Sequence, residues 1–139
     1  MNPLTTMEIK LCQAQAKIFE NSVSKTNYSS LIFIRRFMYS TIAKSMDKRV
    51  YLYQSDSITD ALNTINEEFG ESSYGKIKYS EDQMYWIGYI YRCISIDLDT
   101  YHRINPSNFF QSIGHFLLLV LLIYRRQKSR HQLVDTYIN

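Results

Sequence analysis

The stretch Tyr85-Trp86-Ile87-Gly88-Tyr89-Ile90-Tyr91-Arg92 decides how this chain is expected to fold. It holds the only tryptophan of the sequence and three of its twelve tyrosines. Apolar side chains recur on several faces at helical spacing, which is typical of a helix buried in a protein core. Gly88 lies in the middle, where glycine costs about 1 kcal/mol relative to alanine. We therefore expect another backbone to pack closely against Gly88.

A helix-start signal precedes this stretch. Ser80 and Gln83 have the spacing of a capping box, in which each side chain bonds to the other residue's backbone N–H. Glu81 and Asp82 fall in the first turn, where the helix dipole favours negative charge. The sequence thus predicts a helix over residues 81–96. Its apolar faces are formed by Met84, Ile87, Tyr91 and Ile94 and by Trp86, Ile90 and Cys93.

Three more helices are predicted by the same periodicity, over residues 7–23, 31–46 and 58–69. Capping boxes at their starts are indicated by Thr5 with Glu8 and by Ser57 with Asp60, and Ser29 or Ser30 caps the second helix. Leu31 and Tyr39 are counted in the apolar face of the second helix, and Gly70 is expected to be a left-handed C-cap of the third. Residues 50–53 form a short apolar run that fits either a strand or a packed connector.

The C-terminal part of the chain has a weaker pattern. We expect a loop over residues 97–106, an apolar helix over 109–124 and a frayed tail over 132–139. The apolar helix falls short of the roughly 20 residues of a membrane span, and polar residues interrupt it. Packing in the core or at an oligomer interface is therefore favoured, and attachment to a membrane stays an alternative.

Together these elements predict a mainly α-helical fold. We expect a single domain over residues 1–139, a compact bundle of four to five helices around the central helix 81–96. The chain has 139 residues, enough to bury a core without staples, and only two prolines and four glycines. Its net charge of +3 is too mild to require nucleic acid as a partner.

No residues show the spacing of a catalytic, cofactor or metal site. His102, His115 and His131 are each isolated from other metal-ligand residues, and there is no glycine-rich phosphate loop. We therefore expect no enzyme activity, no cofactor and no metal. The N-terminus lacks a basic region followed by an apolar core, so we expect a cytoplasmic protein in which Cys12 and Cys93 are reduced, although a bridge between them stays open.

Two surfaces are expected to contact a protein partner: the acidic 56–71 helix and the surface around the basic, aromatic residues 74–79. The residues selected there are Asp60, Glu67, Glu68, Tyr74, Lys76, Lys78 and Tyr79. Acidic residues of this kind more often form a solvated outer face, and a docking face for a basic partner is the sharper hypothesis. In an alternative hypothesis the chain binds DNA phosphates through Arg35, Arg36, Lys44 and Lys48, although the short turn of a helix-turn-helix is missing.

Two segments resemble a widespread family of short, largely uncharacterised proteins of Gram-positive bacteria. The first covers residues 9–20 and continues through Phe37-Met38-Tyr39-Ser40 to Ala43-Lys44. The second is Tyr74-Gly75-Lys76-Ile77-Lys78-Tyr79-Ser80, followed by the stretch from Tyr85 to Arg92. Residues 93–139 depart from the family pattern, which fits a lineage-specific ending or an altered reading frame.

Members of that family are often encoded beside small proteins that resemble ADP-ribosyltransferases. This arrangement implies a toxin–antitoxin or related defence module, in which the present chain binds the toxin of the neighbouring gene. The resemblance provides no catalytic residues. The leading hypothesis is therefore a non-enzymatic, antitoxin-like interaction protein. The alternatives are a DNA-binding regulator of the same operon and a small membrane-associated protein held by residues 109–124, and a homo-oligomer stays open in each case.

Overall fold

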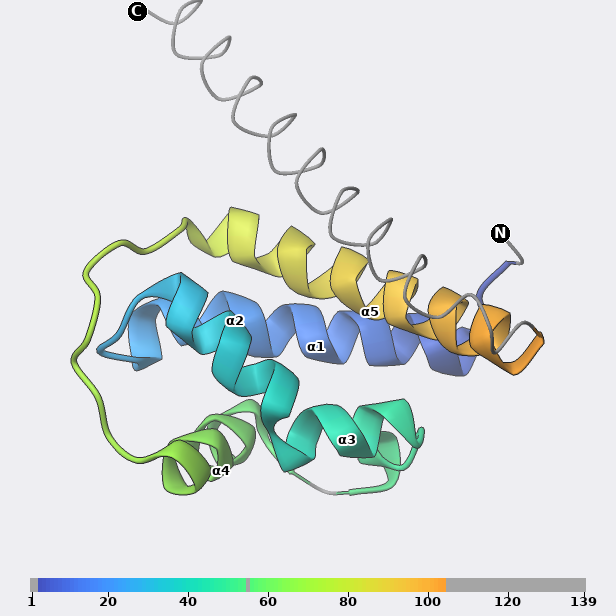
Figure 1. Ribbon diagram of the computed structural model, residues 1–139, viewed down its shortest axis with the longest axis horizontal. Coiled ribbons are helices and arrows are strands. Elements are labelled where there is room, and N and C mark those ends of the chain that lie inside the picture. Colours follow the sequence, from blue (N-terminus) through green and yellow to red (C-terminus); the bar gives the residue numbers. More distant parts are fainter. Residues whose placement is uncertain (1–2, 55, 105–139) are drawn as a thin grey trace, which may run out of the picture. The chain divides into compact units, whose positions relative to one another are not determined.

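Residues 3–54 and 56–104, the part that this computed structural model describes, are built from helices (Figure 1). The elements are α1 (Thr6–Lys25), α2 (Ser30–Tyr39), α3 (Thr41–Asp47), the short 3-10 helix η1 (Tyr51–Tyr53), α4 (Ile58–Phe69) and α5 (Glu81–Ile104). No strand occurs within these two ranges. The predicted mainly α-helical fold is confirmed, and the apolar run at residues 50–53 is a helical connector.

The chain divides into two compact units, Met1–Ile96 and Asp97–Asn139. Helix α5 extends from the first unit to Ile104, so the predicted end at Ile96 and the predicted loop are wrong for residues 97–104. No glycine or proline lies between Gly88 and Pro106 to end the helix earlier. The predicted helix 109–124 and tail 132–139 lie outside the described residues, and the single domain over 1–139 stays a prediction.

Helix α5 lies antiparallel to α1 in the first unit (Figure 1). The two helices approach closely at Gly88, where an added Cβ would lie 2.8 Å from Cγ of Phe19 and 3.0 Å from the backbone oxygen of Gln15. A side chain cannot enter this space unless α1 or Phe19 shifts. The predicted close contact at Gly88 is confirmed, and its partner is α1.

Polar groups are buried in the same contact. The Gln15 side chain donates from Nε2 to the Gly88 carbonyl at 3.0 Å and accepts from Nε of Arg92 at 2.7 Å. Arg92 is only 2% exposed, and its Nη1 donates to the exposed carboxylate of Asp47 at 2.5 Å. Because each bond satisfies a group that burial removes from water, the network favours one register of α5 on α1 and ties α5 to the end of α3.

The rest of the core forms between α1, α2, α3, α4, η1 and the first turns of α5. Phe19 contacts the rings of Phe33 and Phe37 edge-on, with centroids 5.3 and 4.9 Å apart. The other fully buried apolar side chains include Leu11, Ile18, Met46, Ile65 and Met84. On α5 the ends of the predicted face, Met84 and Ile94, are buried, and the two residues between them are half-buried. Trp86 is 42% exposed, so its predicted place in a buried face is wrong.

The predicted helix 31–46 is in fact two helices, α2 and α3, separated at Ser40. Ser40 is extended, with φ −77° and ψ 159°, and its hydroxyl donates to the Phe37 carbonyl and accepts from the Ala43 N–H. The carboxylate of Glu68 also accepts from the Thr41 N–H at 3.1 Å. Since these bonds satisfy groups at the interrupted helix ends, the break is stable despite the continuous apolar pattern.

The predicted capping residues are observed at four helix starts, and Ser29 caps α2 by accepting from the Ile32 N–H. Ser57 with Asp60 and Ser80 with Gln83 make reciprocal capping boxes, while the Thr5 side chain accepts from the Glu8 N–H. Gly70 has the expected positive φ of 79°, and its N–H bonds to the Asn66 carbonyl. Its ψ of 162° is not left-handed helical, so the chain leaves α4 in an extended direction.

We expect Gly88→Ala to lower the free energy of unfolding by about 1–3 kcal/mol, because the new methyl group overpacks the contact with Phe19 and Gln15. This change opposes the gain in helix propensity that alanine brings. Urea denaturation measures the effect. Asn63→Ala, at an exposed position of α4, is the control and should change stability by less than about 0.5 kcal/mol. Unchanged stability of Gly88→Ala would contradict the close contact.

Candidate protein-interaction surface

The described residues contain neither a metal-binding cluster nor a membrane-spanning helix. Within residues 3–54 and 56–104, no three His, Cys, Asp or Glu side chains are grouped so that they could hold a metal ion. Over the same ranges, every helix is too short or too polar to cross a bilayer.

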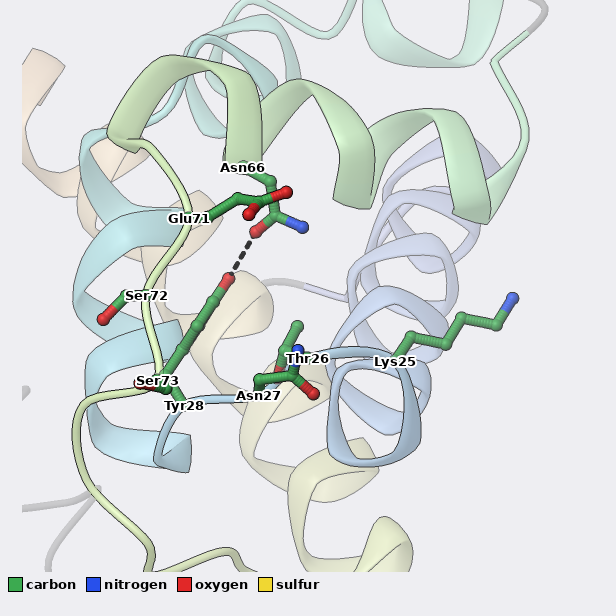
Figure 2. A pocket seen from close by; sticks show the side chains of 8 residues that line it. All are labelled: Lys25, Thr26, Asn27, Tyr28, Asn66, Glu71, Ser72 and Ser73. Carbon is green, nitrogen blue, oxygen red and sulfur yellow. Dashed lines mark hydrogen bonds between the residues drawn. The ribbon is translucent and has the colours of Figure 1, made fainter.

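A polar hollow of about 350 Å³ lies between the end of α1, α4 and the residues after α4 (Figure 2). Tyr28 crosses it, and its hydroxyl donates to Oδ1 of Asn66 at 2.9 Å. The remaining lining residues are Lys25, Thr26, Asn27, Glu71, Ser72 and Ser73. Small-molecule sites are mainly apolar with a few convergent polar groups. The lining of this hollow is mainly polar, so it does not resemble a small-molecule site. The Lys25 ammonium donates to the Thr59 hydroxyl on α4.

An extended segment, residues 71–80, connects α4 to α5 and lies against the start of α2. The carbonyl of Tyr74 accepts from the Ser29 N–H at 3.2 Å, and the carbonyl of Ile77 accepts from the Ser30 N–H at 3.1 Å. The Ser30 hydroxyl accepts in turn from the Tyr79 N–H at 2.9 Å. The segment thereby satisfies N–H groups at a helix start, which have no partner inside the helix.

Gly75 permits this close contact. Its φ is +79°, a conformation that side chains other than glycine rarely adopt, and an added Cβ would lie 2.7 Å from Oγ of Ser29. The hydrogen bonds and the glycine together place the backbone of the segment at a defined position on α2. Side chains that point away from α2 are therefore presented from a fixed backbone.

Two of the residues selected from the sequence in this segment have structural roles. The Lys78 ammonium donates to the carbonyls of Val23 and Thr26 at the end of α1, where helix carbonyls lack partners. Tyr79 is half-buried and packs against the core. The role of Lys78 could not be predicted from the neighbouring sequence, because Val23 and Thr26 lie more than fifty positions away.

The other selected residues of the segment face solvent. Tyr74 is 78% exposed, and Lys76 is exposed as well. Ile77, which the sequence reasoning did not select, is 74% exposed. An apolar residue between two lysines is the sequence feature that could have indicated its exposure. Tyr74, Lys76 and Ile77, called the 74–77 patch below, combine two large apolar side chains with one positive charge on an ordered backbone.

The acidic residues selected on α4 do not act as one surface. Asp60 accepts from the backbone and hydroxyl of Ser57, and these bonds, the hydroxyl bond foremost, hold the pKa of its carboxyl below the ordinary value. Glu68 caps α3 through Thr41. Glu67 is exposed and has no such role among the described contacts. Of the three, Glu67 is the one left for a partner.

The basic residues of the DNA-binding alternative also differ in their environments. Arg36 donates to the Gly70 carbonyl at 2.6 Å and lies over the ring of Tyr28 at 4.5 Å, so its guanidinium is engaged within the fold. Arg35, Lys44 and Lys48 are exposed. The structure therefore leaves three of these four cations accessible.

A second exposed row runs along α2. Leu31 and Tyr39 are 62% and 69% exposed, and Arg35 lies between them at the spacing that places all three on one helix face. The predicted place of Leu31 and Tyr39 in the buried apolar face is wrong. The side chains of α2 that the core buries fully are Phe33 and Phe37. Leu31 directly follows Ser30, the residue bonded to Ile77, so the row begins beside the 74–77 patch.

Comparison with protein-family models, with curated proteins and with solved structures gave no match for this chain. The resemblance of its two segments to a Gram-positive family thus stays a prediction. The assignment of function depends on the surface geometry and on that resemblance.

We expect Lys78→Met to lower the free energy of unfolding by about 1 kcal/mol, since it removes the hydrogen bonds to the last carbonyls of α1. Lys76→Met is the matched control: the same chemical change two residues away, at a side chain without such contacts, should alter stability by less than about 0.5 kcal/mol. Thermal or urea unfolding compares the two. Equal stability of both variants would contradict the capping role of Lys78.

Proposed function

We propose that this protein is a non-enzymatic protein-interaction module that acts as the antitoxin-like partner of a toxin encoded by a neighbouring gene. The observation that carries the proposal is the 74–77 patch, in which Tyr74 and Ile77 are exposed on a backbone held by hydrogen bonds to Ser29 and Ser30. The toxin as partner is supported by the resemblance of residues 74–80 and 85–92 to the Gram-positive family.

The chemistry of the patch is suited to a protein partner. Tyrosine supplies large apolar area with a polar tip, and aromatic residues are enriched in the buried centres of interfaces. Since hydrogen bonds already hold the backbone of the segment, little backbone conformational entropy is lost when Tyr74 and Ile77 become buried. Lys76 adds a positive charge that orients an acidic region of the partner.

The proposed mechanism is occlusion. Tyr74 and Ile77 enter an apolar depression at the mouth of the toxin's active cleft, and the surrounding surface excludes substrate. The exposed row of Leu31, Arg35 and Tyr39 extends the contact along α2. No residue of the chain reacts in this mechanism, so inhibition is reversible and stoichiometric. Glu67, the free acidic residue of α4, is a further contact for a basic partner region.

Binding to DNA has less support than binding to a protein. Of the four basic residues selected for phosphate contact, Arg36 is engaged with Gly70 and Tyr28. The prominent exposed groups beside Arg35 are the apolar side chains of Leu31 and Tyr39, which contribute little to phosphate recognition.

We expect the combined change Tyr74→Ala and Ile77→Ser to weaken the complex with the neighbouring gene product at least about 30-fold, because central apolar side chains dominate interface energies. Isothermal titration calorimetry on the purified pair measures this change. The control is Tyr53→Ala, since Tyr53 on η1 is 75% exposed and therefore comparable in chemistry and accessibility. This control should bind within about twofold of the wild type.

Two outcomes separate the parts of this proposal. Absence of a complex at micromolar concentration, together with no rescue of growth when both genes are expressed, would contradict the toxin partner. A tight complex that is weakened equally by Tyr53→Ala and by the double variant would keep the partner and contradict the 74–77 patch as its contact. Unfolding curves of all variants are measured to check that each one retains the fold.

A further inference from the structure

Two free thiols meet across the contact between α1 and α5. The Sγ atoms of Cys12 and Cys93 are 3.2 Å apart, although the residues are separated by 81 positions in the sequence. These are the only cysteines of the chain. A disulfide requires sulfurs about 2.05 Å apart, so closing the bond from this arrangement takes a movement of roughly 1 Å.

The surrounding packing holds the two thiols in this position. Gly88 lets α5 approach α1, and Gln15, which lies one turn from Cys12 on α1, bonds to the Gly88 carbonyl and to Arg92. Arg92 immediately precedes Cys93. Because these buried bonds favour one register of the helices, the cysteines face each other as a consequence of the fold and have no other partner to bridge within the chain.

The two sulfurs differ in access. Cys12 is fully buried, whereas Cys93 is half-buried and retains contact with solvent. Burial and the hydrogen bond with Cys93 raise the pKa of the Cys12 thiol well above its ordinary value, only partly offset by Arg92. A small oxidant therefore meets Cys93 first, and Cys12 is shielded from direct reaction.

We propose that Cys12 and Cys93 form a modification site at which hydrogen peroxide generates a reversible intramolecular disulfide between α1 and α5. The Cys93 thiolate attacks one oxygen of the peroxide. An S–O bond forms, the O–O bond breaks, and the departing hydroxide takes a proton to become water. Cys12 then loses its proton and attacks the sulfenic sulfur of Cys93, so that the S–S bond forms and the second oxygen leaves as water.

The overall step converts two thiols and one peroxide into one disulfide and two waters, and a dithiol reductant reverses it by returning two electrons. The disulfide closes a loop of about 80 residues, which spans nearly all of the first unit. A cross-link of this length strongly restricts the unfolded chain. Oxidation is therefore expected to stabilise the fold. This inference is independent of the proposed toxin partner, since it concerns the chain alone.

The test compares the reduced, full-length protein before and after treatment with a small excess of hydrogen peroxide. Intact mass is expected to fall by about 2 Da, and peptide mapping is expected to find Cys12 joined to Cys93. The midpoint of thermal unfolding should rise by on the order of 10 °C and return to its starting value with dithiothreitol. The variants Cys12→Ser and Cys93→Ser should show neither the disulfide nor the rise.

Three results would overturn the inference. One is that both thiols remain open to alkylation in urea after peroxide treatment that oxidises free cysteine in the same solution. Another is accumulation of sulfinic acid on Cys93, which would show that Cys12 does not reach it. The third is a disulfide that forms only when peroxide is added to the chain in urea. If a serine variant fails to fold, the wild-type comparison with and without dithiothreitol decides the question alone.

Discussion

The contact of Gly88 with α1 is the constraint on which the rest of the described structure depends. The absence of a side chain at this position lets α5 reach Phe19 and the backbone of Gln15. At that distance the Gln15 side chain bridges the Gly88 carbonyl and the buried guanidinium of Arg92, which continues to Asp47 at the end of α3. A wider separation would break both bonds of the Gln15 side chain, to Gly88 and to Arg92, and unpaired buried polar groups are costly in a low-dielectric interior.

The candidate surface follows from how the chain reaches this contact. After α4 the backbone must pass the start of α2 before α5 begins, and it does so as the extended segment anchored at Ser29 and Ser30. The anchors use backbone groups of the segment, and the side chains of Tyr74 and Ile77 lie in solvent. Two apolar residues are thus exposed on an ordered backbone, and this arrangement is the basis for proposing a protein partner.

Local features of this fold could be predicted from the sequence, whereas features that depend on distant partners could not. The capping boxes at Ser57 and Ser80 involve neighbouring residues. A close contact at Gly88 could be predicted because glycine inside a helix is costly without a packing reason, but its partner on α1 could not. The break at Ser40 was missed because Glu68 of α4 stabilises the new helix start. In the candidate surface, Lys76 and Lys78 are indistinguishable by composition, and their roles differ because the end of α1 lies near one of them. Leu31 and Tyr39 have the spacing of an apolar helix face, but they are exposed because Phe33 and Phe37 fill the core on that helix.

The packing of α5 on α1 is tested most directly by a nuclear Overhauser measurement between the Hα protons of Gly88 and the ring protons of Phe19. The two residues are 69 positions apart in the sequence, so only the packing of α5 on α1 brings them together. We expect strong cross-peaks, accompanied by contacts from the Gln15 side chain to Gly88. Absence of these cross-peaks in a protein whose α1 and α5 are both helical would contradict the central contact.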